Sequence, residues 1–148
     1  MNNLVITAGG IVLKDDKILF IYKKGKWDLP KGKVEHGSNS RDTAVIEISE
    51  ETGLPHEQLN IIEELIPTSY HKIINNVSIV KKTDWFLIEF LGSIDAALIP
   101  DMNEGITECK WVSIDQIKET LDCSYVRIQY LLDFFINMPF YIKYKKNF

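Results

Sequence analysis

Apolar residues recur along this chain with two different periods, and the shorter period predicts strands. Two apolar runs rich in β-branched residues, Val5–Leu13 and Lys17–Tyr22, flank a short polar turn at 14–16. This arrangement is typical of a β-hairpin. Three further apolar stretches predict strands at Leu59–Ile73, Val77–Phe90 and Cys109–Val112.

The longer period predicts helices in the middle and at the end of the chain. One helix is expected to begin near Ser40, whose hydroxyl can cap the free N–H groups of the first turn, and to end at Gly53 and Pro55. Two helical stretches are expected after the last strand. In the longer of them, four apolar residues at i, i+3, i+4 and i+7 form a stripe that should pack on the sheet: Ile128, Leu131, Leu132 and Phe135.

Length and composition limit the number of domains and the kinds of partner. With 148 residues and 45% hydrophobic composition, the chain can bury one sizeable core, so a single domain over residues 1–148 is expected. The net charge of -4 argues against binding duplex nucleic acid through a uniformly basic surface. Residues 1–11 lack the pattern of a signal peptide, and no apolar run approaches the ~20 residues that span a bilayer. A soluble, cytoplasmic protein with no membrane partner is therefore expected.

Two features are left open by composition. Cys109 and Cys123 lie 14 positions apart without C-x-x-C spacing, which favours free thiols over a zinc site or a disulfide. The oligomeric state is undetermined, with a homodimer as one alternative.

Three glutamates share one face of the helix expected from Ser40 onward. At about 100° per residue, Glu50 and Glu51 fall within roughly 60° of Glu47. Like charges at this spacing repel, and a bound cation would reverse that penalty. Carboxylates are preferred ligands of magnesium and manganese. Taken alone, however, an E-x-x-E-E pattern is more often a solvated acidic face than a metal site.

A cluster of lysines precedes these glutamates. Five lysines fall within eleven positions around Gly32: Lys23, Lys24, Lys26, Lys31 and Lys33. Ammonium groups suit phosphate oxygens, and a glycine lets the backbone approach a ligand closely. A lysine run by itself is as typical of a solvated strand end. The combination with the glutamates is what favours phosphate chemistry.

The segment from Gly32 to Leu54 resembles the Nudix box, G-x5-E-x7-R-E-U-x-E-E-x-G-U, where U is a bulky apolar residue. Seven positions match at fixed spacing: Gly32, Glu47, Ile48, Glu50, Glu51, Gly53 and Leu54. Ser38 stands in place of the family's glutamate and Ile46 in place of its arginine. The resemblance implies an α/β fold, a Nudix-type α/β/α sandwich with a mixed β-sheet between helices.

The same resemblance implies a metal-dependent hydrolase that cleaves a phosphoanhydride bond. The Gly32 carbonyl with Glu47, Glu50 and Glu51 would hold Mg²⁺ or Mn²⁺, and Glu47 is the first candidate for the catalytic base. Glu104 is the candidate for an additional metal-binding carboxylate, ahead of the alternative Glu108. Ser38 and Ile46 together replace a charged pair, which the fold should tolerate but which puts the rate in doubt.

Residues outside the box point to the substrate. The Trp27–Gly32 segment resembles the W-x-L-P-K-G motif of diadenosine tetraphosphate hydrolases, and Lys81 to Trp85 resembles their K-x-x-x-aromatic strand. By this resemblance, Lys31, Lys33 and Lys81 would meet phosphates and Trp85 would stack on a base, with packing as its alternative role.

The expected substrate is a small-molecule nucleotide, first of all a dinucleoside polyphosphate. ADP-ribose, oxidised nucleoside triphosphates, diphosphoinositol phosphates and RNA 5′ ends are alternatives, because substrate-selecting loops diverge within a fold. The departures at Ser38 and Ile46 keep open a weakly active or inactive nucleotide-binding or sensor protein. A third alternative is a structural domain that binds a protein partner through residues 140–148.

Overall fold

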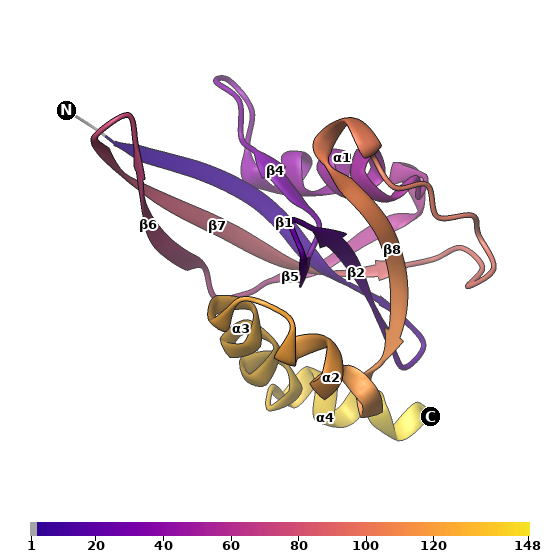
Figure 1. The fold of residues 1–148 in the computed structure, drawn as a ribbon. Helices are drawn as coiled ribbons and strands as arrows, with labels where there is room; N and C mark the ends of the chain where they lie inside the picture. The colour runs from indigo at the N-terminus through magenta and orange to yellow at the C-terminus, as the bar shows by residue number, and fades with distance from the viewer. Residues whose placement is uncertain (1–2) are drawn as a thin grey trace.

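The computed structural model describes residues 3–148 and places a mixed β-sheet between two layers of helices (Figure 1). The predicted α/β fold class is confirmed. The strands are β1 (Leu4–Lys14), β2 (Lys17–Lys23), β3 (Lys26–Asp28), β4 (Lys31–Lys33), β5 (Leu59–Glu64), β6 (Thr68–Ile74), β7 (Val77–Phe90) and β8 (Ile106–Ser113). The helices are α1 (Ser40–Thr52), α2 (Ile117–Asp122), α3 (Val126–Ile136) and α4 (Pro139–Tyr144).

The centre of the sheet is the parallel pair of β1 and β7. These two strands are paired over ten positions, from Leu4 opposite Val80 to Leu13 opposite Glu89. The first two strands form the predicted hairpin, with Lys14 opposite Lys17. Away from that turn, β2 pairs with β8, whereas β1 pairs with the short β4. The sheet therefore divides between β1 and β2, and this division frames the cavity described below.

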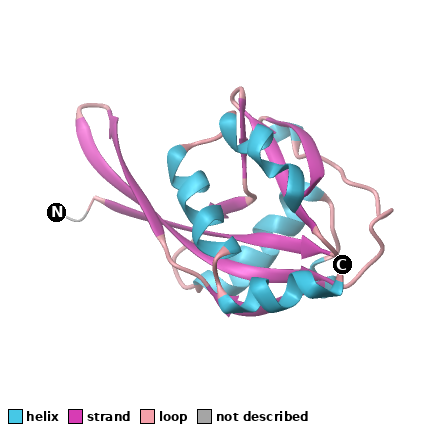
Figure 2. Ribbon diagram, turned by 90° about the horizontal axis from the view of Figure 1, so that it is seen from below, coloured by secondary structure: helices cyan, strands magenta, loops and turns pink. Residues whose placement is uncertain are grey.

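Both faces of the sheet are buried because alternate residues of the central strands face different helices. In β7, Phe86 and Ile88 belong to the apolar cluster under α1. The intervening Trp85 and Leu87 belong to the cluster under α2, α3 and α4. Figure 2 shows the helices on the two sides of the strands. The predicted α3 stripe is confirmed, since all four of its residues are completely buried: Ile128, Leu131, Leu132 and Phe135.

Two predicted elements are divided more finely in the structure. The single strand expected at Leu59–Ile73 is two strands, β5 and β6, separated by residues 65–67, and both pair with β7. The two helical stretches expected at the end of the chain are three helices, α2, α3 and α4. None of the helices between residues 3 and 148 combines the length and apolar character needed to cross a bilayer.

The sequence suggested Ser40 as the cap of α1, but in the structure the cap is Asn39. The Asn39 side-chain oxygen accepts a hydrogen bond from the Asp42 N–H at 2.8 Å. Ser40 is the first helical residue, and its hydroxyl donates to Asp84 of β7 at 2.6 Å. The helix ends as predicted at Gly53, which adopts φ 81° and donates its N–H to the Ser49 carbonyl. The start of α1 is thus tied directly to the sheet.

Candidate active site

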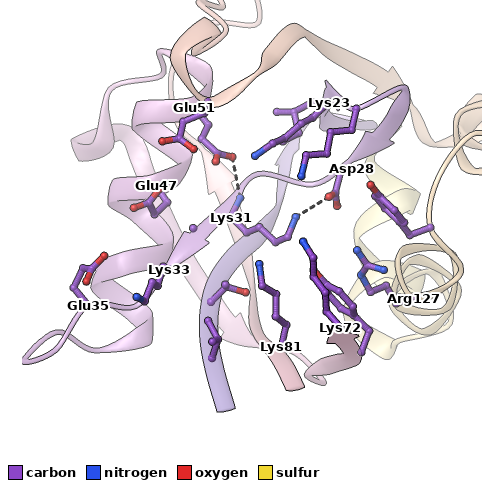
Figure 3. A pocket seen from close by; sticks show the side chains of 18 residues that line it. Lys23, Asp28, Lys31, Lys33, Glu35, Glu47, Glu51, Lys72, Lys81 and Arg127 are labelled. Carbon is purple, nitrogen blue, oxygen red and sulfur yellow. Dashed lines mark hydrogen bonds and ion pairs between the residues drawn. The ribbon is translucent and has the colours of Figure 1, made fainter. Parts of the chain in front are cut away.

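A cavity of about 380 Å³ lies where β1, β2 and β4 meet the inner side of α1 and the start of α3 (Figure 3). Its lining is strongly charged although the chain as a whole is only mildly acidic. The lining bases are Lys23, Lys24, Lys31, Lys33, Lys72, Lys81 and Arg127. The lining acids are Asp28, Glu35, Glu47, Glu51 and Glu104. The two halves of the predicted chemistry, carboxylates and phosphate-binding bases, therefore share one cavity.

Glu51 is the most deeply buried carboxylate of this group. Its residue is 4% exposed, and one oxygen accepts a hydrogen bond from the backbone N–H of Lys31 at 3.1 Å. Burial raises the pKa of Glu51 to about 8, although that hydrogen bond and the positive charges of Lys31 and Lys23 act in the opposite direction. An anion at this depth needs a cation nearby, because burial penalises its charged form.

Glu47 lies one helical turn earlier, directly against Gly32 of β4. A Cβ atom at position 32 would overlap the Glu47 carboxylate. The missing side chain of Gly32 is therefore what allows the carboxylate to reach the strand. Burial raises the pKa of Glu47, and so do the neighbouring negative charges, in decreasing order of effect Glu50, Glu104, Glu35 and Asp101.

This set of donors fits a hard divalent cation. The carboxylates around Glu47 are close enough to raise its pKa, and a bound Mg²⁺ or Mn²⁺ would relieve that repulsion. Among residues 3–148, no three His, Cys, Asp or Glu side chains converge into a preformed metal site. Magnesium usually completes its shell with water and substrate phosphates, so such convergence is not required. The assignment of metal ligands stays a prediction.

The structure separates Glu50 from the other two glutamates of its helix face. Glu50 is exposed and borders a surface depression beside residues 99–103, whereas Glu47 and Glu51 line the main cavity. Glu104 also lines the main cavity, at the end of a short turn closed by the Glu104 N–H and the Asp101 carbonyl at 3.0 Å. Glu108, the alternative, is exposed on β8 and is not part of the described lining of this cavity.

The three lysines predicted to bind phosphate all line the cavity, but they differ in whether an acidic side chain pairs with them. The Lys31 ammonium lies 2.6 Å from the Asp28 carboxylate, and these side chains are 20% and 7% exposed. Within residues 3–148, Lys33 and Lys81 have no carboxylate at ion-pair distance. Lys33 and Lys81 are therefore available to an anionic ligand, whereas Lys31 already neutralises a buried acid.

Trp85 does not reach the cavity, and the prediction that it stacks on a base is wrong. The residue is 1% exposed and lies within the apolar cluster under α3. Its indole N–H donates to the Thr68 hydroxyl at 2.8 Å. Lys81 and Trp85 project from the same face of β7, but Trp85 lies where the helices cover that face.

The cavity residues contributed by β6 and by the start of α3 were not singled out by the sequence: Tyr70, Lys72, Tyr125 and Arg127. The first two come from β6, in which Tyr70 lies opposite Lys81 of β7. The other two come from the start of α3. One sequence signal was available, because a two-residue Asn75-Asn76 turn pairs Ile74 with Val77 and so sets this register.

The two departures from the Nudix box face solvent. Ser38 is exposed, and Ile46 is 49% exposed. The absence of a charged pair at these positions therefore leaves no buried charge without a partner. The fold accommodates both residues.

Comparison with known proteins agrees with this geometry. A family model described as the NUDIX domain matches residues 4–129. The RNA pyrophosphohydrolase of Pelagibacter ubique (strain HTCC1062) is 28% identical over 125 residues, which cover 76% of this chain and 78% of that protein. For five further curated relatives, the aligned segment covers 48 to 64% of the relative's own length.

Solved structures share the fold. A binary complex of the Ap4A hydrolase of C. elegans superposes with a TM-score of 0.67 at 23% identity, covering 88% of this chain and 94% of that one. A bifunctional NMN adenylyltransferase/ADP ribose pyrophosphatase from Francisella tularensis, complexed with AMP and a Mn ion, superposes with a TM-score of 0.64 at 20% identity. That match covers 92% of this chain and 42% of the other. Since the family match spans most of the sequence, the chain belongs to the NUDIX domain family and is, as predicted, a Nudix-type pyrophosphohydrolase.

Proposed function

We propose that this protein, with bound Mg²⁺ or Mn²⁺, hydrolyses a phosphoanhydride bond of a dinucleoside polyphosphate. The observation that carries the proposal is the division of charge in the cavity. Carboxylates of α1 line one side, and Lys72, Lys81 and Arg127 line the opposite side (Figure 3). A long polyphosphate bridge can be cut beside the carboxylates while its remaining phosphates meet the bases. ADP-ribose, with two phosphates, would leave these lysine and arginine side chains without an anionic partner.

The chain's own residues have distinct roles in this proposal. The Gly32 carbonyl with Glu47, Glu50, Glu51 and Glu104 would hold the metal, the exposed Glu50 after a change of side-chain rotamer. A bound divalent ion lowers the pKa of a water molecule and neutralises phosphate charge. Glu47, which lines the cavity against Gly32, would accept a proton from the attacking water.

Two further contacts hold the substrate-binding side in place. The hydrogen bond from the Lys31 N–H to Glu51 fixes β4 against α1. The Lys31–Asp28 pair fixes the loop that leads into β4. Lys33 and Lys81 would then bind phosphate oxygens from fixed strands, so that little ordering is left for the binding step.

A second candidate function is removal of pyrophosphate from the 5′ end of RNA. It is favoured by the similarity to the Pelagibacter ubique protein, which is named an RNA pyrophosphohydrolase. A 5′-triphosphate presents fewer phosphates than a tetraphosphate bridge but would contact the same lysine and arginine side chains. The two candidates differ in what must follow the phosphates, a second nucleoside or an RNA chain.

A panel of substrates tests both candidates. Diadenosine tetraphosphate, 5′-triphosphorylated RNA, ADP-ribose and ATP are incubated with Mg²⁺, Mn²⁺ or EDTA, with Glu51→Gln as the variant expected to be inactive. We expect the highest kcat/KM on diadenosine tetraphosphate and no turnover in EDTA. A preference for RNA would establish the second candidate, and a preference for ADP-ribose would contradict the polyphosphate proposal. Binding without hydrolysis of any substrate would support the sensor alternative.

A further inference from the structure

We infer that Arg127, held between Tyr70 and Tyr125, forms with Lys72 and Lys81 a second anion-binding subsite that binds phosphate groups and does not read a nucleobase. The inference rests on the proposed function and deepens it, since it assigns these residues to the part of the substrate beyond the cleaved bond. It implies that the protein selects substrates by the number of their phosphates and not by their base.

The position of Arg127 is set by two aromatic rings. Its guanidinium carbon lies 3.9 Å from the ring centroid of Tyr70 and 4.1 Å from that of Tyr125. Contacts this short between a guanidinium and aromatic rings are stabilised by cation–π attraction and stacking. The two rings come from β6 and from the residue preceding α3, so Arg127 joins two distant parts of the chain. The guanidinium thereby fills the space between the two rings, so that a nucleobase cannot insert between them.

The edge of a stacked guanidinium stays free to donate hydrogen bonds. Arginine presents its N–H groups in a planar fork that matches two oxygens of a phosphate. Within residues 3–148, no carboxylate lies at ion-pair distance from Arg127, Lys72 or Lys81. Among the acids that line the cavity, Asp28 pairs with Lys31 and not with these three side chains. Three positive charges on one side of the cavity therefore lack a counter-charge from the described part of the chain.

The backbone adds to this positive side. Tyr70 lies opposite Lys81 across the β6–β7 pair, and Lys72 follows Tyr70 by two positions, so all three side chains share one face of the hairpin. Helix α3 starts at Val126, and no side chain among residues 3–148 caps its first turn. The positive end of that helix thus borders the same region as Arg127. An anion bound here would relieve the mutual repulsion of the Arg127, Lys72 and Lys81 side chains.

Binding of inorganic tripolyphosphate tests the subsite without turnover. Affinities are measured by calorimetry in EDTA, so the outcome does not depend on whether any dinucleotide is hydrolysed. We expect Arg127→Gln to weaken binding by roughly tenfold or more, the effect of losing hydrogen bonds between charged groups. Arg127→Lys should weaken it less, because the charge stays while the planar fork is lost. Lys118→Gln, an equal change of charge on α2 outside this cavity, is the matched control and should bind normally.

The rings are tested by Tyr70→Leu and Tyr125→Leu, which leave the charge unchanged. Each should weaken tripolyphosphate binding several-fold because the guanidinium loses its fixed position. Diadenosine and diguanosine tetraphosphates, measured in the same buffer, should bind the unmodified protein with similar affinity. Unchanged tripolyphosphate affinity in Arg127→Gln would overturn the inference. So would a preference for one base that disappears in Tyr70→Leu, since the rings would then be reading the base.

Discussion

The Glu47 carboxylate occupies the space that any side chain at position 32 would need. Gly32→Ala should therefore displace the carboxylate while leaving the backbone in place, because the overlapped atoms are the flexible end of a side chain. A displacement of about 1 Å in a catalytic group can lower turnover by roughly 100-fold. We expect such a loss in kcat with little change in the midpoint of thermal unfolding. Near-normal turnover would show that this position of Glu47 is not the working one.

Glu51 should make stability depend on pH in the absence of metal. Burial raises its pKa to about 8 from an ordinary value of 4.5, so the folded protein holds this proton more tightly than the unfolded chain does. The free energy of unfolding is then largest below about pH 4.5 and falls as pH rises towards 8. Glu51→Gln removes this dependence and should be more stable at pH 8 by on the order of 1–3 kcal/mol.

The measurement is urea unfolding of both proteins in EDTA at pH 5 and pH 8. All other titrating groups are shared, so the difference between the two proteins isolates Glu51. The difference should grow with pH and shrink when Mg²⁺ is added, because a bound cation stabilises the ionised carboxylate. A difference that stays constant with pH would contradict the assignment.

At the level of elements, the first turn of α1 depends on a single side chain. Asn39→Ala removes the cap and should lower the free energy of unfolding by about 1 kcal/mol. Asn39→Ser keeps an accepting oxygen and adds no charge beside the Asp42 carboxylate, to which the Asn39 amide donates at 2.9 Å, so it should keep most of the stability and serves as the control. Chemical denaturation of the three proteins decides the matter. Equal stability of the alanine variant would show that another group satisfies the Asp42 N–H.

Elements could be predicted where local pattern alone determines them. The α3 stripe and the β1–β2 hairpin follow from periodicity, and both are present. The cap of α1 could not be chosen this way, since Asn39 and Ser40 are adjacent and both residue types cap helices. What decides it is Asp84, which lies on a distant strand and accepts the Ser40 hydroxyl.

At the level of the whole molecule, the two sides of the cavity differ in how far sequence could predict them. Glu47 and Glu51 belong to one continuous segment whose spacing is itself the signal. The opposite side is assembled from β6, β7 and α3, so Arg127 becomes visible only once strand register and helix docking are known. Trp85 illustrates the same limit. It lies four residues after Lys81 on the same face of β7, but helices cover Trp85, whereas Lys81 lines the cavity.

The last prediction concerns Lys31 and Lys81, which the sequence treated alike and the structure separates. Lys81 lines the cavity without an acidic partner among residues 3–148, so it is free to contact phosphates beyond the cleaved bond. Lys81→Ala should lower kcat/KM for diadenosine tetraphosphate. The loss of transition-state stabilisation calculated from the kcat/KM ratio should be about 1–3 kcal/mol, the range for hydrogen bonds to charged groups. The loss should be smaller for ADP-ribose, whose bridge has only two phosphates, and the stability of the fold should not change.

Lys31→Ala should behave differently because it leaves Asp28 buried without its cation. Removing one partner of a buried pair costs about 3 kcal/mol or more, so the free energy of unfolding should fall. Activity should then decline on both substrates to a similar degree, since the Asp28–Lys31 segment also positions Glu51 through the Lys31 N–H. Kinetics on the two substrates, combined with denaturation of each variant, separates these effects. Equal losses on both substrates in Lys81→Ala would show that Lys81 does not discriminate by phosphate number. Unchanged stability in Lys31→Ala would show that the Lys31–Asp28 pair is not a structural contact.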